Sequence, residues 1–300
     1  MFQLGPRKAL GLDGIPAFFY QEFWDIVRND VFRIVHAFFH SGFLLKSLNH
    51  TYTTLIPKVS FVDEVSHFRP ISLCNVIYKV ISKLMVNRLK PFMKNLIDPF
   101  QNAFIRYRNI SDNILIAHEI FDYLRKKKGR KHCFGALKVD MSKAYGKVDW
   151  KFLKAALTAM NFNAFWVNWI MECVTIVRYT LLINGNLSHS FIPKKGLKQG
   201  DPLSPYLFLI CENILSLALM QVENQKKIRG VKLVRNDTPL IHLFFADDAL
   251  LFFKHDALFL SNLQLILNWY CSLSGQNINL SKSDLYCSPN MAEEVKLDLA

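Results

Sequence analysis

The stretch LIHLFFADDALLFF, residues 240–253, carries the strongest signal for the fold of this chain. Two apolar, β-prone runs, Leu243–Phe245 and Ala249–Phe253, flank an adjacent pair of acids, Asp247 and Asp248. This pattern is typical of a tight β-hairpin with two carboxylates at its bend. Aspartate is also a common turn residue without any chemical role, and half-polar flanks would favour that simpler explanation. Because both flanks are apolar, we expect two buried strands beside two carboxylates that repel each other.

A third acid, Asp140, ends another apolar run, Ala136–Val139. Considered alone, this acid is best explained as a cap of the following helix. Considered with Asp247 and Asp248, it completes a set of three carboxylates on two neighbouring strands. Such a set can hold two divalent ions about 3.5–4 Å apart for in-line phosphoryl transfer. Hard cations such as Mg²⁺ prefer these carboxylate oxygens.

The loop KKGLKQGDPLSP, residues 194–205, predicts a phosphate-binding environment. It contains two glycines, which let the backbone approach a ligand closely, and three lysines at 194, 195 and 198. A helix is expected to start directly after it, with free N–H groups at its N-terminus. The loop does not match a Walker A motif, so an ordinary ATPase is disfavoured.

Composition narrows the class of protein. The chain has 37 Lys and Arg against 24 Asp and Glu, a formal charge of +13, which predicts a polyanionic partner such as nucleic acid or an acidic membrane surface. Half of the residues are hydrophobic, so a folded chain of one or two domains is expected. The six cysteines are scattered and form no CxxC pair, which favours free thiols in a reducing compartment and no disulfide-linked partner.

One stretch, residues 203–222, is apolar enough to resemble a membrane span. Glu212 and Asn213 lie in its middle, where charge is costly in lipid, so we predict a buried core helix and no stable membrane association. Residues Met1–Ala9 have no apolar signal core, which predicts an intracellular protein without deciding between nucleus and cytoplasm.

Periodicity predicts the remaining elements. Helices are expected over residues 18–46, 76–90, 150–160, 165–177 and 258–273, and strands over 51–57 and 134–139. Asn184 and Gly185 predict a hairpin turn between strands 179–183 and 189–192. In the helix 76–90, one side is apolar and the other is basic without acids to pair with, which suggests contact with a phosphate backbone or simply a solvated face. The apolar positions are Ile77, Val80, Ile81 and Leu84, and the basic ones are Lys79, Lys83 and Lys90.

A further helix is expected to start with Ser111 or Asp112 as its N-cap and to end at a basic run, residues 125–129, that suits a helix C-terminus. Its predicted buried positions are Ile114, Ala117, Phe121 and Leu124.

Three segments together resemble the central motifs of reverse transcriptases: Lys138–Tyr145, Gly196–Pro205 and Phe245–Asp248. Further segments, in the expected order, resemble those of plant LINE-type (non-LTR) retrotransposons. They are Leu55–Lys58, Phe68–Asn75, Gln101–Phe104 with Asp112–Asn113, and Ser274–Ser283. The resemblance extends from about residue 5 to residue 289.

The resemblance implies an α+β fold with the right-hand polymerase architecture. Residues 1–135 would form the fingers and N-terminal region with its basic helices, 136–289 the palm, and 290–300 the start of a thumb or connection that is otherwise missing. The implied function is an RNA-directed DNA polymerase, a nucleotidyltransferase that adds dNTPs to a primer 3′-hydroxyl. It would use an RNA template, a DNA primer and two Mg²⁺ ions, with Mn²⁺ as an alternative.

The resemblance also implies a role for each site residue. Asp140, Asp247 and Asp248 would bind the metal ions and carry catalysis. The remaining expectations concern the incoming nucleotide: Lys58 and Arg69 at the triphosphate, Tyr145 as a gate against the ribose 2′-hydroxyl, Gln199 and Gly200 over the nucleotide, and Lys282 near the leaving pyrophosphate.

The chain departs from the family pattern at positions other than these acids. Gly146 stands where the family usually has Asp, Tyr107-Arg108 where it has Gly-Arg, and Leu12 where it has Pro. Two alternatives to an active polymerase therefore stay open. One is a catalytically decayed, nucleic-acid-binding remnant of the same fold, and the other is a membrane-associated basic protein, suggested only by the charge and the apolar stretch.

Overall fold

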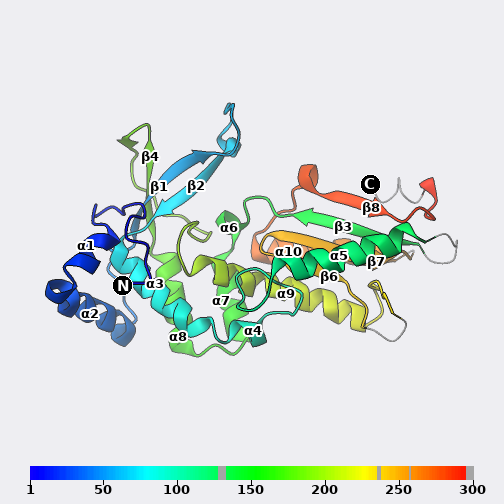
Figure 1. The fold of residues 1–300 in the computed structure, drawn as a ribbon, viewed down its shortest axis with the longest axis horizontal. Coiled ribbons are helices and arrows are strands. Elements are labelled where there is room, and N and C mark those ends of the chain that lie inside the picture. Colours follow the sequence, from blue (N-terminus) through cyan, green and yellow to red (C-terminus); the bar gives the residue numbers. More distant parts are fainter. Residues whose placement is uncertain (128–132, 235–237, 257, 295–300) are drawn as a thin grey trace. The chain divides into compact units, whose positions relative to one another are not determined.

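The computed structural model describes residues 1–127, 133–234, 238–256 and 258–294. The chain forms two compact units, each built from two separated stretches (Figure 1). The first unit comprises Met1–Leu89 and Val148–Leu207, and the second comprises Lys90–Lys147 and Phe208–Ala300. Part of the predicted start of the thumb, residues 295–300, lies outside the described residues, as do residues 128 and 129 of the basic run.

The first unit contains a four-stranded sheet in the order β2-β1-β4-β5. Neighbouring strands are antiparallel except β1 and β4, which are parallel. The strands are β1 (His50–Pro57), β2 (Phe68–Leu73), β4 (Arg178–Ile183) and β5 (Asn186–Leu187), with a 3-10 turn, η1 (Val65–His67), before β2. The helices of this unit are α1 (Ala17–Glu22), α2 (Trp24–Ser41), α3 (Val76–Leu89), α7 (Trp150–Ala159) and α8 (Ala164–Thr175).

The predicted hairpin turn at Asn184-Gly185 is confirmed, but its return strand was placed wrongly. Both turn residues have positive φ, 50° and 81°, as a two-residue turn between antiparallel strands requires. The short turn sets Asn186 opposite Ile183, so β5 begins at once. Of the predicted strand 189–192, Phe191 forms an isolated bridge with Tyr179.

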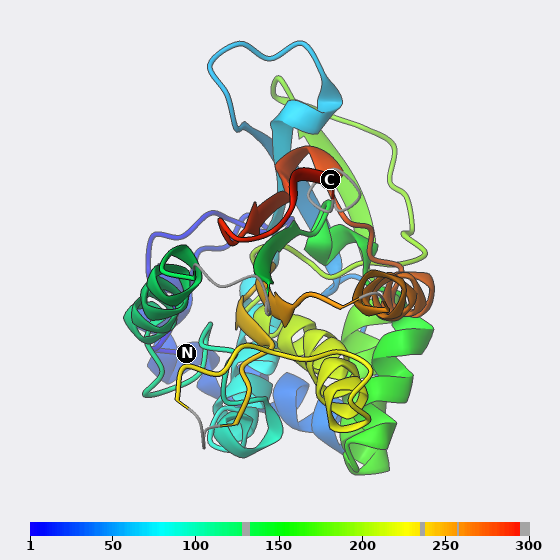
Figure 2. The same ribbon diagram turned by 90° about the vertical axis from the view of Figure 1, so that its right-hand side faces the viewer.

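The second unit contains an antiparallel sheet in the order β6-β7-β3-β8. In Figure 2 the green β3 runs beside the red β8. The strands are β3 (Phe134–Asp140), β6 (His242–Phe245), β7 (Asp248–Lys254) and β8 (Asp284–Cys287). The helical elements are α4 (Met93–Leu96), α5 (Ile110–Arg125), α6 (Ala144–Lys147), α10 (Phe259–Ser274) and η2 (Leu280–Lys282). Helix α9 (Ser204–Asn224) starts in the first unit and continues into the second.

Helix α5 covers one face of this sheet. Ile120 and Leu124 pack with Phe134, Ala136 and Phe252, and they form a core that is closed to solvent. Apolar side chains on the strands and one apolar stripe on the helix stabilise this layer, because each buried aliphatic side chain contributes about 1.5–3 kcal/mol.

The structure corrects one predicted burial in α3 and the predicted N-cap of α5. Leu84 of α3 is 37% exposed, whereas Ile77, Val80 and Ile81 are buried as predicted. In α5 the cap is Asn109, which forms a capping box with Asp112 at the third helical position.

Ile114 of α5 was predicted to be buried but is 47% exposed. The inward face begins at Asn113, whose amide donates to the carbonyl of Phe244 at 2.9 Å. The inward positions that follow are Ile116, Ala117, Ile120, Phe121 and Leu124.

Helix α9 is long and apolar enough to cross a membrane by length and composition, with a mean hydropathy of 1.5, and 61% of the apolar window is buried inside the structure. The core helix of a soluble protein passes the same test. The six cysteines are free thiols, and Cys74, Cys173 and Cys211 are buried.

Candidate active site

The acid pair lies at the tip of the β6–β7 hairpin, as the sequence predicted. Phe245 and Asp248 form the last pair of the ladder, and Ala246 and Asp247 make the turn. Leu243 and Phe252 on the flanking strands are buried, whereas both acids are exposed. Buried strands thus fix the backbone of two solvated carboxylates.

Asp140 lies directly opposite Asp248 in the register of β3 and β7. Opposite residues in an antiparallel pair project from the same face of the sheet, with Cβ atoms about 4.5–5.5 Å apart. Asp247 is next in the chain, so the three predicted acids meet at one end of one sheet. This donor set consists only of hard oxygen ligands and fits Mg²⁺ or Mn²⁺ chemically. In the part of the chain that the structure describes, no group of three or more His, Cys, Asp or Glu side chains is already arranged to hold an ion.

The segment after α10 holds the end of β3 in place. The N–H of Asn279 donates to the carbonyl of Asp140 at 2.8 Å, and the N–H of Asp140 donates to Ser283 Oγ at 3.3 Å. Earlier in the same segment, the buried Gln276 donates through Nε2 to the carbonyl of Ala144 at 2.8 Å. This segment is the downstream motif Ser274–Ser283. Its contacts with β3 show how that motif fixes the backbone around Asp140.

A fourth acid, Glu212 of α9, lies near the pair and is only 4% exposed. Burial raises the pKa of Glu212 well above its usual range, and the negative charges of Asp247 and Asp248 raise it further. A hydrogen bond from Gln101 lowers this pKa but does not outweigh the other effects. From the sequence, Glu212 gives an argument against a membrane span and no indication of a role beside the acid pair. An isolated acid amid the apolar residues of a core helix was the available signal.

Tyr145 lies in α6, directly after the end of β3. Its ring stacks on Phe208 with centroids 5.0 Å apart and an interplanar angle of 17°. Burial raises the pKa of Tyr145, and the charges of Asp247 and Glu212 raise it further, so the phenol stays neutral. The stacked ring is therefore held close to the acids.

In the first unit, Lys58 and Arg69 lie at the tip of the β1–β2 hairpin. Arg69 is exposed and pairs in register with Ile56, two residues before Lys58. The Lys58 Nζ donates to the carbonyl of Ser66 at 3.0 Å. The hairpin thus brings these two predicted triphosphate ligands together.

The loop with Gln199 and Gly200 is hydrogen-bonded to β2. The N–H of Ser72 donates to the carbonyl of Gln199 at 2.7 Å. Gly200 has a φ of 114°, and a Cβ on it would lie 2.9 Å from the carbonyl oxygen of Ser72. Glycine is therefore required both by the backbone conformation and by the close approach of β2.

One lysine of this loop does not serve a phosphate site as predicted. Lys198 is buried, its Nζ donates to Asn49 Oδ1, and it lies 3.3 Å from the centroid of the Tyr78 ring. Burial lowers the pKa of Lys198. The exposed lysines of the loop are Lys194 and Lys195.

The helix N-terminus after the loop is also less open than predicted. The N–H of Leu203 already donates to Ser82 Oγ at 3.1 Å and to Asp201 Oδ1 at 3.3 Å. This N–H is satisfied within the protein and does not point freely at a ligand.

The predicted nucleic-acid-binding lysines differ in their surroundings. Lys79 donates through Nζ to the carbonyl of Ala9 at 3.2 Å, and burial lowers its pKa. Lys83 is half-buried, and Lys90 is exposed just beyond the end of α3. Lys282 is exposed in η2 of the second unit.

Comparison with known proteins assigns the family. The family profile described as "Reverse transcriptase (RNA-dependent DNA polymerase)" matches residues 56–297. The chain belongs to the reverse transcriptase family. This reverse transcriptase chain is 30% identical over 278 residues to the "Transposon TX1 uncharacterized 149 kDa protein" of Xenopus laevis, covering 92% of this chain and 20% of that protein.

A second relative is the "Retrovirus-related Pol polyprotein from type-1 retrotransposable element R2" of Popillia japonica. It is 26% identical over 233 residues, which cover 77% of this reverse transcriptase chain and 31% of the polyprotein. The chain thus spans about a fifth to a third of these relatives, and it is a reverse transcriptase domain of the non-LTR type found in R2 and TX1 elements. The relatives do not support the plant origin suggested by the motifs.

Solved structures agree on the fold. The structure of apo telomerase from Candida tropicalis, truncated from its C-terminal domain, matches with a TM-score of 0.53 at 14% identity. The match covers 82% of this chain and 51% of the telomerase chain. The α+β, right-hand polymerase fold of a reverse transcriptase is thereby confirmed, and reverse transcriptases generally use divalent metal ions.

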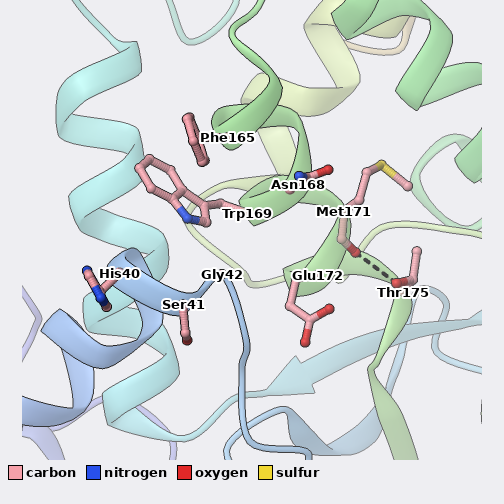
Figure 3. Close-up of a pocket in the computed structure, with 9 residues that line it drawn as sticks. All are labelled: His40, Ser41, Gly42, Phe165, Asn168, Trp169, Met171, Glu172 and Thr175. Carbon is pink, nitrogen blue, oxygen red and sulfur yellow. Dashed lines mark hydrogen bonds between the residues drawn. The ribbon is translucent and has the colours of Figure 1, made fainter.

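A pocket of about 400 Å³ lies between α2 and α8 in the first unit of this reverse transcriptase domain (Figure 3). It is lined by Trp169, Phe165 and Glu172 of α8 and by His40 of α2, among others. Glu172 already accepts the N–H of Leu44 at 3.1 Å. None of the predicted site residues lines this pocket.

Proposed function

We propose that this chain is the core of an RNA-directed DNA polymerase, which copies an RNA template by adding dNTPs to the 3′-hydroxyl of a DNA primer. The observation that carries the proposal is the register of β3 and β7, with Asp140 opposite Asp248 and Asp247 beside it. An adjacent cross-strand pair of carboxylates is destabilising in water and needs a reason to persist. The formal charge of +13 supports a nucleic-acid partner.

Asp140, Asp247 and Asp248 would hold two Mg²⁺ ions, with Mn²⁺ as an alternative. When bound, such ions stabilise the charge that develops on the attacking and leaving oxygens. The protein contributes rigid positions for its oxygen ligands, since Asp140 and Asp248 lie on paired strands with buried flanks.

The other predicted residues would act on the nucleotide. Lys58 and Arg69, gathered at one hairpin tip, would bind the triphosphate, and Gln199 with Gly200 would contact the nucleotide. Tyr145 would exclude a ribose 2′-hydroxyl, which its stacked ring is rigid enough to do. Lys282 would lie near the leaving pyrophosphate.

Of the three lysines proposed for the nucleic-acid backbone, Lys83 and Lys90 keep that role best, because Lys79 is bound to Ala9. By the same resemblance, residues 1–135 act as fingers with the N-terminal region, 136–289 as palm and 290–300 as the start of a thumb. A plant LINE-type origin is likewise a proposal, drawn from the motifs.

A catalytically decayed remnant that still binds nucleic acid is the second candidate. The observation that favours it is the φ of 64° at Tyr107, a conformation that suits the glycine usual in the family. The conformation costs a residue with a Cβ about 1–2 kcal/mol, a loss that a copy without selection for activity would tolerate.

Primer extension on an RNA template separates the two candidates. We expect the chain to extend a DNA primer with Mg²⁺ or Mn²⁺, and we expect Asp140→Asn and Asp248→Asn to abolish extension while binding of the primer–template stays intact. Asp284→Asn is the matched control, because Asp284 is an exposed acid on β8 of the same sheet. Binding without extension by the unaltered chain would favour the remnant.

A further inference from the structure

The upstream motif Gln101–Phe104 lies beside the acid hairpin within the second unit. The N–H of Phe244 donates to the carbonyl of Phe100 at 2.9 Å, and the N–H of Asn102 donates to the carbonyl of Phe244 at 3.2 Å. Gln101 and Phe244 thereby form a parallel bridge. The motif adds a short parallel edge to β6, immediately before the turn that carries the acids.

The Gln101 side chain extends this contact to the turn itself. It is 2% exposed, and its Oε1 accepts the N–H of Ala246 at 3.2 Å and the N–H of Ala103 at 2.8 Å. Its Nε2 donates to Glu212 Oε2 at 2.6 Å. One amide therefore joins the turn, its own loop and helix α9.

Ala246 needs such a partner for two reasons. It has a φ of 54°, in the left-handed region that disfavours any residue with a Cβ. It is also buried, so its N–H would lose the Gln101 acceptor where water is poorly placed to replace it. Since Asp247 follows directly, a change in the conformation of Ala246 would reorient the acid pair.

Glu212 fixes which way the amide points. Its carboxyl takes the Nε2 end, so Oε1 faces the two N–H groups. A methionine at position 101 would fill a similar volume but would supply neither the acceptor nor the donor.

Arg108 fixes the backbone that carries Gln101. Its guanidinium donates to the carbonyl of Gln101 at 2.7 Å and to three other carbonyls, one in α4 and two in the loop that follows it. These are the carbonyls of Lys94 at 2.9 Å, Ile97 at 3.1 Å and Asp98 at 2.5 Å. The side chain of Gln101 thus starts from a loop that is held at four points.

We propose that Gln101, oriented by Glu212, is a positioning residue that holds Ala246 in its left-handed conformation and so sets the direction of Asp247 and Asp248. The structural part of this inference concerns the unliganded chain. Its kinetic consequence rests on the proposed polymerase function.

The first test measures hydrogen exchange of the Ala246 amide by NMR in the full chain without metal. Gln101→Met is expected to speed exchange at Ala246 by more than about tenfold, because the amide loses its acceptor. Exchange in α5, for example at Ile120 and Leu124, should stay unchanged. Gln264→Met is the matched control, since Gln264 lies on the exposed face of α10 in the same unit.

The second test exchanges the two partners. Gln101→Glu alone sets two carboxyl groups against each other and is expected to lose protection of Ala246. Combined with Glu212→Gln, it restores a donor at 212 and an acceptor at 101, so protection should return. In primer extension, Gln101→Met should lower kcat by about ten- to a hundredfold and leave the KM for dNTP nearly unchanged, because misplacement of about 1 Å has effects of this size.

Unchanged exchange at Ala246 in Gln101→Met would overturn the proposal, as would equal loss of protection throughout α5, which would indicate general unfolding. Failure of the double variant Gln101→Glu, Glu212→Gln to regain protection of the Ala246 amide would also overturn the proposal. If the unaltered chain extends no primer, the polymerase proposal fails, while the exchange measurements still decide the role of Gln101.

Discussion

Tyr107 is the clearest case of a single residue in conflict with its backbone. Its φ is 64°, its ring is exposed, and the Arg106 guanidinium lies over the ring, 4.7 Å from the ring centroid. A left-handed conformation costs a residue with a Cβ about 1–2 kcal/mol. The glycine common in the family at this position therefore has a local physical reason.

We predict that Tyr107→Gly unfolds at higher urea concentration than Tyr107→Ala, by about 1 kcal/mol in free energy of unfolding. Both variants lose the ring contact with Arg106, so the difference between them isolates the backbone strain. Alanine proving equal to or better than glycine would contradict the prediction, because glycine otherwise costs folding entropy.

Gly146 presents the opposite situation, a glycine where a side chain is tolerated. It is the third residue of α6, its φ is not positive, and nothing lies within 4 Å of an added Cβ. We predict that Gly146→Ala raises the free energy of unfolding by about 0.5–1 kcal/mol through loss of unfolded-state entropy.

Gly146→Asp should add about 0.3–1 kcal/mol more, since an acid in the first turn of a helix is favourable. It should also raise the rate of primer extension, because α6 carries Tyr145 and begins only four positions after Asp140. Urea titration and single-nucleotide extension of the glycine, alanine and aspartate versions provide the measurements. Equal stability of all three would remove the argument that Gly146 marks decay.

At the scale of elements, local sequence patterns predicted the helices and strands. They did not predict burial or exposure that depends on residues far away in the sequence. The acid hairpin, the strand before Asp140 and the helices followed from alternation and helical periodicity. Burial of Lys198 depends on Asn49 and Tyr78, which are far away in the sequence, so no local pattern could have shown it. The outward position of Ile114 has the same kind of cause, since Asn113 is drawn inward by Phe244.

The candidate site, like the fold, was predictable in part: the sequence indicated the three acids but not the role of Gln101. The three acids were found because their flanks are apolar, and the register of β3 and β7 sets two of them opposite each other. In the sequence, Gln101 stands out only as part of a motif, because an uncharged amide in a loop has no chemical signature until its partners Ala246 and Glu212 are known.

The opposed carboxylates on β3 and β7 should reduce stability in the absence of metal. We predict that Asp140→Asn and Asp248→Asn each raise the free energy of unfolding by about 0.2–1 kcal/mol in a buffer with chelator, because like charges directly opposite on a sheet repel. Adding Mg²⁺ should stabilise the unaltered chain and leave both variants nearly unchanged. Asp284→Asn should behave as the unaltered chain does, and lower stability of the asparagine variants without metal would contradict the prediction.

Glu212 should make stability depend on pH. Because burial and the nearby acids raise its folded pKa above the usual 4.5, the folded chain keeps a proton that the unfolded chain releases. The stabilisation is complete below pH 4.5 and is lost as pH rises toward the raised folded value. Stability should therefore fall by up to about 1.4 kcal/mol per pH unit in that window.

Urea midpoints at several pH values, compared with those of Glu212→Gln, test this prediction, because the amide removes the titration and should flatten the slope. The titration of Asp98 does not add to the slope in the pH window above 4.5 where Glu212 titrates. Burial opposes its ionisation, but hydrogen bonds from His242 and from the N–H of Phe100 outweigh burial and lower its pKa. The contribution of Asp98 to the free energy of unfolding is therefore complete above its ordinary pKa of 3.8 and is lost only at more acidic pH. Parallel slopes for the unaltered chain and Glu212→Gln would contradict the assignment.

At the scale of the whole molecule, the excess of 13 positive charges should dominate binding to nucleic acid. We predict that affinity for an RNA–DNA duplex falls at least about tenfold between about 50 and about 200 mM salt, because counterions are released on binding. Lys83→Gln and Lys90→Gln should each make the logarithm of the binding constant fall less steeply with the logarithm of salt concentration. Lys79→Gln should change this slope less, because the Lys79 Nζ donates a hydrogen bond to the carbonyl of Ala9. Filter binding across a salt series gives the slopes, and binding that is insensitive to salt would contradict both candidate functions.

The division of each unit into two separated stretches has a consequence for synthesis on the ribosome. The first unit cannot be completed until residue 207 has left the exit tunnel, and the sheet of the second unit also needs β8, which ends at Cys287. Asp140 must therefore wait for a partner strand that is made more than a hundred residues later, since Asp248 is 248 − 140 = 108 positions further along. Long-range strand pairing of this kind folds slowly and exposes apolar strands in the meantime. The nascent chain would thus depend on chaperones at least until β8, which ends at Cys287, has emerged.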